Sequence, residues 1–198
     1  MHEIPVAEPS IGQFRGRLDR TRLRWVIIRR AEPSDLVEVA AIAERSWQGA
    51  YDGLLKPQTV SAWVEAAYSP AALRQRWEDH PIYLIVEEGT VVAFADAFIE
   101  DDQIVASALC THPGYRRRGA ASILLDWIRS LAPPLPIVAD VVLGSQAAES
   151  FFEAKGFSPG ETIQVTLFGE RIIERRWWLG TSLHTPKDDR RPAADRLG

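Results

Sequence analysis

The segment His112–Ala121, which reads HPGYRRRGAA, carries the residues best suited to chemistry. A β-prone run, 104–111, precedes it and a helix-prone run, 120–131, follows it, so a tight loop leading into a helix is predicted. The first turn of a helix has unpaired N–H groups and a partial positive charge, and therefore attracts anions. Gly119 lets the backbone approach closely, and the arginines add charge. This combination favours binding of a phosphate or pyrophosphate.

The spacing of Arg116, Gly119 and Ala121, R-x-x-G-x-A, resembles the pyrophosphate-binding signature of the GNAT superfamily, the acyl-CoA-dependent N-acyltransferases. Two other phosphate motifs fit poorly, because no Lys follows Gly119 as in a P-loop and the dinucleotide pattern G-x-G-x-x-G is absent. The alternative is an exposed basic turn that binds nothing, since loops are commonly polar and glycine-rich.

A second motif, nearer the C-terminus, favours the interpretation of this loop as a pyrophosphate-binding site. Ala148, Gly156 and Phe157 match the superfamily pattern N-x-x-A-x-x-x-Y-x-x-x-G-F at the expected spacings. Two positions depart from it: Ser145 stands where Asn is usual, and Phe152 where Tyr is usual. Ser145 also suits a helix N-cap and Gly156 a helix C-terminus. The two motifs together, in this order, are much more specific than either alone.

The resemblance implies that acetyl-CoA is the co-substrate. It implies that the strand before the loop pairs with the pantetheine arm, and that the loop backbone cradles the pyrophosphate. The residues expected to bind acetyl-CoA are Leu109, Cys110, Thr111, Arg116, Arg117, Arg118, Gly119, Ala120, Ala121, Ser145, Ala148 and Phe152. The acceptor amine is expected near Trp47 and Tyr51, which lie four residues apart on one predicted helix face. The alternative is that these two rings only pack.

Catalytic candidates are few. Asp96 shares a predicted strand face with aromatic residues, so it is a candidate general base with a raised pKa; the alternative is a half-exposed carboxylate near a sheet edge. Ser145 is the second candidate, although an ordinary alcohol is a poor acid. Phe152 lacks the phenol that a Tyr would bring to the leaving thiolate. Cys110 is expected to be a buried small hydrophobe rather than a nucleophile, because no His in the motif would activate it.

Composition excludes several classes of protein. The chain has 198 residues, 46% of them hydrophobic, and a formal net charge of -4, which does not favour a nucleic-acid partner. The single cysteine excludes an internal disulfide and a cysteine-cluster metal site, and no metal is expected. No apolar run is long enough to span a membrane, and the N-terminus lacks the apolar core of a signal peptide. A cytoplasmic monomer or homodimer is expected.

The resemblance covers most of the chain. Residues 1–24 are expected to be a flexible extension, the alternative being an arm that binds a partner or touches nucleic acid. Residues 25–180 are expected to be a GNAT-like domain, and 181–198 a disordered tail. The predicted fold is α/β, with a mixed, mostly antiparallel sheet and helices on both faces. The implied function is N-acetyl transfer from acetyl-CoA to a primary amine, of a small molecule or a peptide, by direct attack. The alternative is a weak or inactive acyl-CoA-binding sensor or interaction module.

Overall fold

The structure is a computed structural model that describes residues 12–14 and 26–180. The predicted tail 181–198 and most of the predicted extension 1–24 lie outside these residues. The elements are β1 (Gly12–Phe14), β2 (Val26–Arg30), the 3₁₀ turn η1 (Pro33–Asp35), α1 (Leu36–Tyr51), α2 (Pro57–Tyr68), α3 (Pro70–Asp79), β3 (Ile82–Glu87), β4 (Thr90–Glu100), β5 (Gln103–Thr111), the 3₁₀ turn η2 (Pro113–Tyr115), α4 (Ala120–Leu131), β6 (Ile137–Val142), α5 (Gln146–Ala154), β7 (Ser158–Leu167) and β8 (Glu170–Leu179).

The strands form one sheet in the order β1-β2-β3-β4-β5-β6-β8-β7. Every neighbouring pair is antiparallel except β5 and β6, which run parallel because α4 crosses over between them. Residues 12–14 pair with β2 as an edge strand, so this part of the predicted extension belongs to the sheet. The predicted mixed, mostly antiparallel sheet is confirmed.

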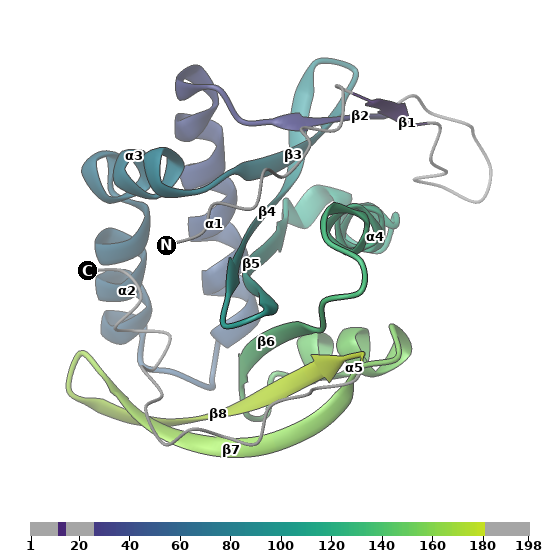
Figure 1. Cartoon of the computed structure of the whole chain (residues 1–198). Coiled ribbons are helices and arrows are strands. Elements are labelled where there is room, and N and C mark those ends of the chain that lie inside the picture. Colours follow the sequence, from purple (N-terminus) through teal and green to yellow (C-terminus); the bar gives the residue numbers. More distant parts are fainter. Residues whose placement is uncertain (1–11, 15–25, 181–198) are drawn as a thin grey trace.

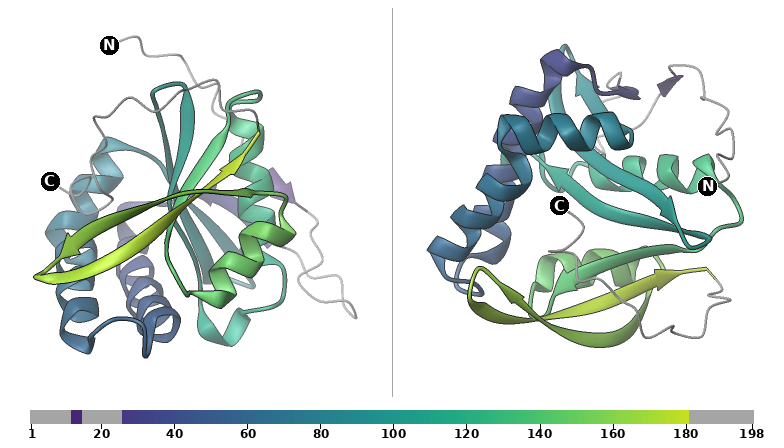
Figure 2. Two further views of the ribbon diagram at one scale, coloured as in Figure 1. Left: turned by 90° about the horizontal axis from the view of Figure 1, so that it is seen from below. Right: turned by 60° about the vertical axis from the view of Figure 1, so that its left-hand side comes forward.

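Helices cover both faces of the sheet, as predicted. Helices α1, α2 and α3 pack on one face, and α4 and α5 on the other (Figure 1). The β7–β8 hairpin curves from the α5 side to the α1–α2 side (Figure 2), where the Glu170 carboxylate accepts a hydrogen bond from the Lys56 N–H at 3.1 Å.

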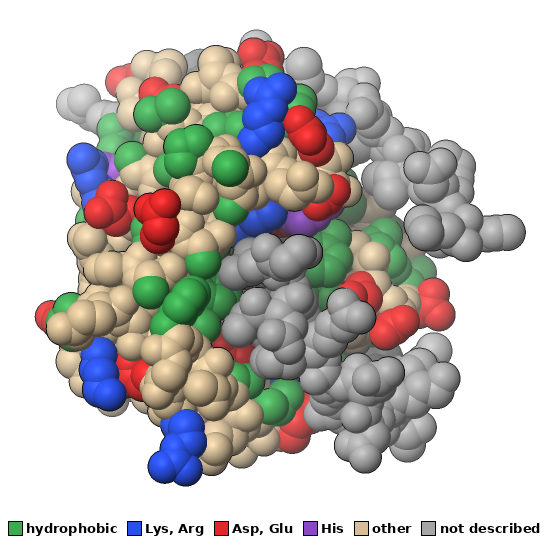
Figure 3. All heavy atoms as spheres, turned by 90° about the vertical axis from the view of Figure 1, so that its left-hand side faces the viewer, with side chains coloured by type: hydrophobic (Ala, Val, Ile, Leu, Met, Phe, Trp, Pro, Cys, Tyr) green, Lys and Arg blue, Asp and Glu red, His purple; other side chains and the backbone are tan. Residues whose placement is uncertain are grey.

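Seen from the α2–α3 side, acidic and basic side chains form small separate groups around apolar ones (Figure 3). No helix in the described residues is both long and apolar enough to cross a membrane.

Strand β4 departs from the predicted alternation at one residue. Phe94 and Asp96 share the face toward α1–α3, as expected, but Val92 packs on the opposite side against the α4 core. The register with β3 shifts between Ile85 and Val86, so Val92 has no directly opposed partner. Such a bulge turns the following residues to the other face. Val92 and Phe94 therefore lie on opposite faces of the sheet, although their positions in the chain are two residues apart.

A buried ion pair joins the neighbouring strands β6 and β8. Asp140 on β6 lies directly opposite Arg176 on β8. Two hydrogen bonds, of 2.8 and 2.7 Å, connect the guanidinium to the carboxylate, and both side chains are more than nine-tenths buried. This bidentate geometry is the most favourable one for such a pair. Removing one partner would leave an uncompensated buried charge.

We therefore predict that Asp140→Ala lowers the free energy of unfolding by about 3–5 kcal/mol. The double variant Asp140→Ala/Arg176→Met should lose less free energy of unfolding than Asp140→Ala, because the charge of Arg176 is then not left without its partner. Urea denaturation of the two variants and the wild type measures both values. A double variant that is less stable than Asp140→Ala would contradict the explanation.

Candidate functional site

The parallel strands β5 and β6 separate soon after they meet. They pair only at Ile104 with Ile137 and at Val105 with Val138. Beyond that point β5 stays paired with β4, while β6 stays paired with β8. The carboxyl ends of both strands lead into helices, α4 and α5, that cover the same face. In open α/β sheets a crevice beside the carboxyl ends of adjacent strands is the usual place for a ligand.

A one-residue bulge lies at the point of separation. Asp96 lies opposite Ala108 and Ala97 opposite Ala106, so Ser107 is left without a directly opposed residue. Side chains change faces across this bulge: Ala106 packs in the core under α4, whereas Ala108 packs in the core under α1–α3. The bulge therefore reverses which residues of β5 point to each side.

Strand β5 presents backbone groups to the gap after the bulge. The N–H of His112 bonds to the carbonyl of Val92 in β4, at 2.9 Å. Backbone directions alternate in an antiparallel pair, so Leu109 and Thr111 direct their N–H and C=O groups away from β4. That is the side from which β6 has separated. Both residues are among those that the resemblance implied for acetyl-CoA binding.

The loop between β5 and α4 has the geometry of an anion site. Gly119 is the N-cap of α4, with φ of 97° and ψ of -2°, and Arg117 has φ of 64°. Left-handed residues in a loop turn successive N–H groups toward one point, and a following helix adds its dipole. Ala120 is buried and Ala121 half-buried, so neither brings bulk to the first turn. The predicted strand, loop and helix start are confirmed.

Two of the three arginines make contacts within the protein. Arg116 donates a hydrogen bond to the carbonyl of Ser46 in α1, at 3.4 Å. The Arg118 guanidinium lies 4.9 Å from the centre of the Tyr115 ring. Both side chains therefore brace the loop, and the backbone N–H groups remain the better candidates for holding a phosphate. Arg117 is exposed.

A buried charge cluster supports the bulge from the α1–α3 side. Asp96 is fully buried, and its Oδ2 atom accepts a short hydrogen bond from the Nη2 atom of Arg76. The same nitrogen donates to Ser107 Oγ at 3.2 Å, and Nη1 donates to the carbonyl of Ala67 at 3.2 Å. The other Asp96 oxygen lies 2.6 Å from Nε2 of His80. The cluster thus connects α2, α3, β4 and the exposed bulge of β5.

The proposed role of Asp96 needs correction. Burial would raise the pKa of Asp96, but the His80 imidazole and the Arg76 charge outweigh it and hold the pKa below its ordinary value. Asp96 is therefore an ionised, buried carboxylate that is poorly suited to take a proton. The alternative interpretation, a half-exposed carboxylate, is also wrong, because no surface of Asp96 is exposed.

Trp47 and Tyr51 lie on one face of α1, as predicted, with ring centres 4.7 Å apart. Trp63 of α2 extends this group, with its ring centre 5.1 Å from that of Trp47. Trp47 and Tyr51 are half-buried against the α1–α3 core. Burial raises the pKa of Tyr51, so its phenol stays protonated. The rings thus form an aromatic wall on the α1–α2 side of β5. This arrangement is compatible both with binding of the acceptor amine and with packing alone.

Cys110 is buried beside this wall, on the α1–α3 face of β5. Burial raises the pKa of its thiol to about 11. A thiol that stays protonated is a poor nucleophile. The prediction of a buried small hydrophobe is confirmed.

The candidates on α5 lie on the other side of the gap. Ser145 is buried at the start of α5, where its carbonyl accepts from the N–H groups of Ala148 and Glu149. Its side chain makes no capping bond, so the predicted N-cap is correct in position only. Phe152 is buried, with its ring centre 4.9 Å from that of Phe157 and 6.3 Å from that of Trp177. This packing is the ordinary role of a core aromatic residue.

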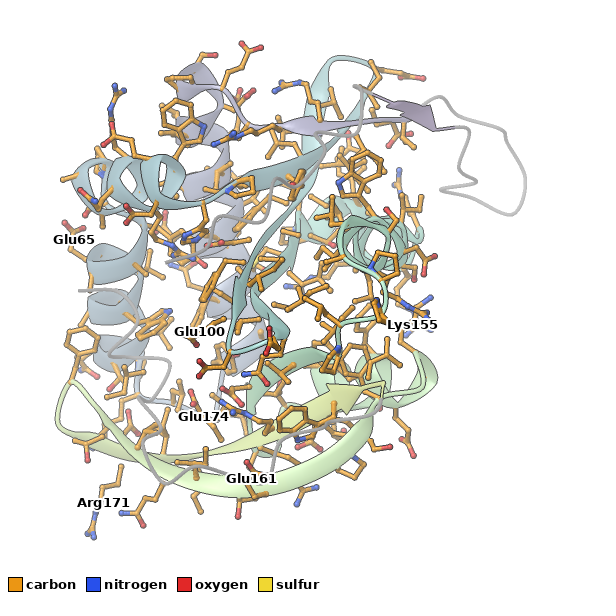
Figure 4. The ribbon with its side chains drawn as sticks, in the orientation of Figure 1. Glu65, Glu100, Lys155, Glu161, Arg171 and Glu174 are labelled. Atoms are coloured by element: carbon orange, nitrogen blue, oxygen red, sulfur yellow. The ribbon has the colours of Figure 1, made fainter. Side chains whose placement is uncertain are left out.

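Two acidic side chains lie between the β4–β5 and β7–β8 hairpins. These are Glu100 and Glu174, whereas Glu65 and Arg171 point outward (Figure 4). The charge of Glu174 adds to burial in raising the pKa of Tyr51, so this carboxylate lies close to the aromatic wall.

Solved structures with a similar fold are N-acetyltransferases. A GCN5-related N-acetyltransferase from Rhodopseudomonas palustris superposes with a TM-score of 0.67, at 24% identity over 78% of this chain and 94% of that chain. The PaiA N-acetyltransferase from Thermoplasma acidophilum, solved with coenzyme A, superposes with a TM-score of 0.63, at 19% identity over 76% of this chain and 97% of that chain. These two likenesses concern the fold.

Sequence comparison places the chain within this group. The profile of the acetyltransferase (GNAT) family matches residues 47–157, which is more than half of the chain. An uncharacterized N-acetyltransferase from Mycobacterium tuberculosis is 28% identical over 130 residues, covering 63% of this chain and 83% of that protein. The chain belongs to the acetyltransferase (GNAT) family, and the predicted resemblance is confirmed.

Sequence reasoning missed Arg76, His80 and Ser107. One signal was present: Leu73, Arg76 and His80 follow one another at three- and four-residue spacing, so Arg76 occupies the apolar face of α3. An arginine at such a position needs a buried acidic partner. No comparable signal marked Ser107, because a bulge depends on the partner strand.

We predict that Gly119→Val weakens the affinity for coenzyme A at least about tenfold, because a β-branched residue is strained at positive φ and would crowd the loop. The matched control, Arg118→Ala, should change the affinity less than about threefold, since it removes one exposed charge. Titration calorimetry measures both. An equal loss of affinity for coenzyme A in Gly119→Val and Arg118→Ala would contradict a site built from backbone groups.

Proposed function

We propose that the protein is an N-acetyltransferase that transfers an acetyl group from acetyl-CoA to a primary amine by direct attack. The observation that carries the proposal is the gap between β5 and β6, where backbone groups along one edge have no strand partner among the described residues and a helix begins at the end. A single ligand with an extended amide-bearing arm and a pyrophosphate suits both features. Membership of the acetyltransferase family supports the same ligand.

Leu109 and Thr111 would pair with the amides of the pantetheine arm, as an additional strand would. The backbone from Arg117 to Ala121 would hold the pyrophosphate. The thioester would then lie toward the bulge at Ser107, since the arm runs back along β5 from the loop. A backbone N–H near the bulge would polarise its carbonyl, which is an oxyanion-hole type of contribution.

The acceptor would approach from the α1–α3 side. Trp47 and Tyr51 would form one wall, and Glu174 adds negative charge that favours an amine. A small molecule and a peptide amine are both compatible with this wall. Holding the two substrates together supplies much of the rate, and no covalent enzyme intermediate is needed. The cytoplasm is the expected compartment, supported by a single unpaired cysteine.

One observation favours a second candidate, an acyl-CoA-binding module with little or no turnover. Phe152 occupies the position at which the superfamily pattern has Tyr, and its ring is packed in the core. A phenol that would protonate the leaving thiolate is therefore missing there. Water must then supply that proton in an active enzyme.

The test is to incubate the protein with acetyl-CoA and a panel of primary amines, including polyamines, amino acids and short peptides. We expect thiol release that depends on the amine, and acetylated amine detected by mass spectrometry. Double-reciprocal plots should intersect, because both substrates are bound before transfer. Tight coenzyme A binding without acetylation of any amine would favour the second candidate, and absence of binding would contradict both.

A further inference from the structure

The proposed reaction needs a group that removes a proton from the acceptor amine, and Asp96 does not suit that role. His80 directly follows α3 and reaches the same carboxylate, with its Nε2 atom 2.6 Å from Asp96 Oδ1. The arrangement is that of an acid–imidazole pair, in which a buried carboxylate orients the ring and stabilises the positive charge that forms on it. Arg76 occupies the other carboxylate oxygen and keeps Asp96 ionised.

We propose that His80 accepts the proton of the acceptor amine, directly or through one water, and that Asp96 is the residue that positions it. This inference rests on the proposed acetyltransferase function. In the step, the amine nitrogen forms a bond to the thioester carbonyl carbon while the carbon–sulfur bond breaks with its electron pair on sulfur. The amine proton passes to the imidazole and then to solvent, and the thiolate takes a proton from solvent.

The position of His80 relative to the bulge supports this role. The Nη2 atom of Arg76 contacts both Asp96 and Ser107, so the His80–Asp96 pair and the bulge are bound to one guanidinium. The ring of His80 also lies 4.9 Å from that of Phe98, two residues beyond Asp96 on β4. His80 is therefore held on the α1–α3 side of the bulge, which is the side proposed for the acceptor.

Part of the His80 side chain stays exposed. Its Nε2 atom is buried beside Asp96, and 19% of the side chain is exposed, so the exposed surface belongs to the other side-chain atoms. In the proposal, Asp96 orients the ring at Nε2, and Nδ1 is the nitrogen that faces substrate or water. The charged groups that the structure connects with His80 among the described residues are Asp96 and, through Asp96, Arg76.

Other titratable groups near the bulge fit less well. Burial raises the pKa of Tyr51, Tyr68 and Cys110, so each stays protonated near neutral pH, and a neutral phenol or thiol is too weak a base to take the amine proton. Glu174, on β8, is the competing base, because its charge is felt by Tyr51 of the aromatic wall. The experiment must therefore separate His80 from Glu174.

We would compare His80→Gln and Glu174→Gln with the wild type on the amine with the highest kcat/KM. His80→Gln should lower kcat about 10²–10⁴-fold, the usual range for general base catalysis, and leave the KM for acetyl-CoA unchanged. The acidic limb of the wild-type profile of kcat/KM against pH should disappear in His80→Gln and persist in Glu174→Gln. A loss of kcat in Glu174→Gln, together with an unchanged kcat in His80→Gln, would overturn the assignment.

A second variant covers the case in which His80→Gln is unstable. His80→Ala leaves room for a small base, so added imidazole should restore kcat without changing the melting temperature, which a purely structural role would not allow. No rescue in a folded His80→Ala would overturn the inference. A wild type that acetylates amines while His80→Gln keeps full kcat would overturn this inference alone. A wild type that acetylates no amine would overturn the proposed function as well.

Discussion

The contact between Arg76 and Asp96 is the interaction on which the rest of the site depends. Asp96 is fully buried, and its charge is stable there because a guanidinium and an imidazole occupy its two oxygens. A buried pair of this kind is a weak source of net stability, since desolvation offsets much of the attraction. Its geometry is nevertheless strongly fixed, because loss of either partner leaves a buried charge. The contact therefore acts mainly to hold β4, α3 and the bulge of β5 in one arrangement.

The bulge turns this local contact into a property of the whole site. Before the bulge, the N–H of Ile104 donates to the carbonyl of Pro136, which directly precedes β6. After the bulge, Leu109 and Thr111 direct their N–H groups into the gap. A strand without the extra residue would present the neighbouring residues instead, with the opposite set of side chains. The one-residue shift also places Ala108 and Cys110 under the aromatic wall of α1 and α2. One irregularity therefore sets which backbone and side-chain groups β5 presents on each side.

The sequence predicts most of the architecture and the strand, loop and helix start of the candidate anion site, because these depend on local patterns. The predicted run 104–111 matches β5 (Gln103–Thr111) to within one residue, and the predicted bounds of α4 match the observed helix Ala120–Leu131. A glycine at position 119 is compatible with the left-handed conformation that the loop adopts there. These features involve neighbours in the chain, so a single sequence is sufficient to indicate them.

Features that depend on contacts distant in sequence were not predictable. The pKa of Asp96 depends on Arg76 and His80, which lie on another element, and a strand pattern alone carries no information about them. The contacts of Arg116 with Ser46 and of Arg118 with Tyr115 were likewise not predictable from the sequence motif. The motif draws attention to the charge of this loop, whereas the structure makes its backbone the better candidate for a binding surface.

We propose that acetyl-CoA binds in the gap beside β5, with its pyrophosphate at the start of α4. Amide hydrogen exchange resolved to single residues, with and without saturating coenzyme A, can test this placement. Because β6 has separated there, Leu109 and Thr111 have no strand partner on the gap side among the described residues, and their amides should exchange quickly in the free protein. The account predicts that coenzyme A slows exchange at these two amides and at those from Arg117 to Ala121. Protection confined to other segments, with these amides unchanged, would contradict it.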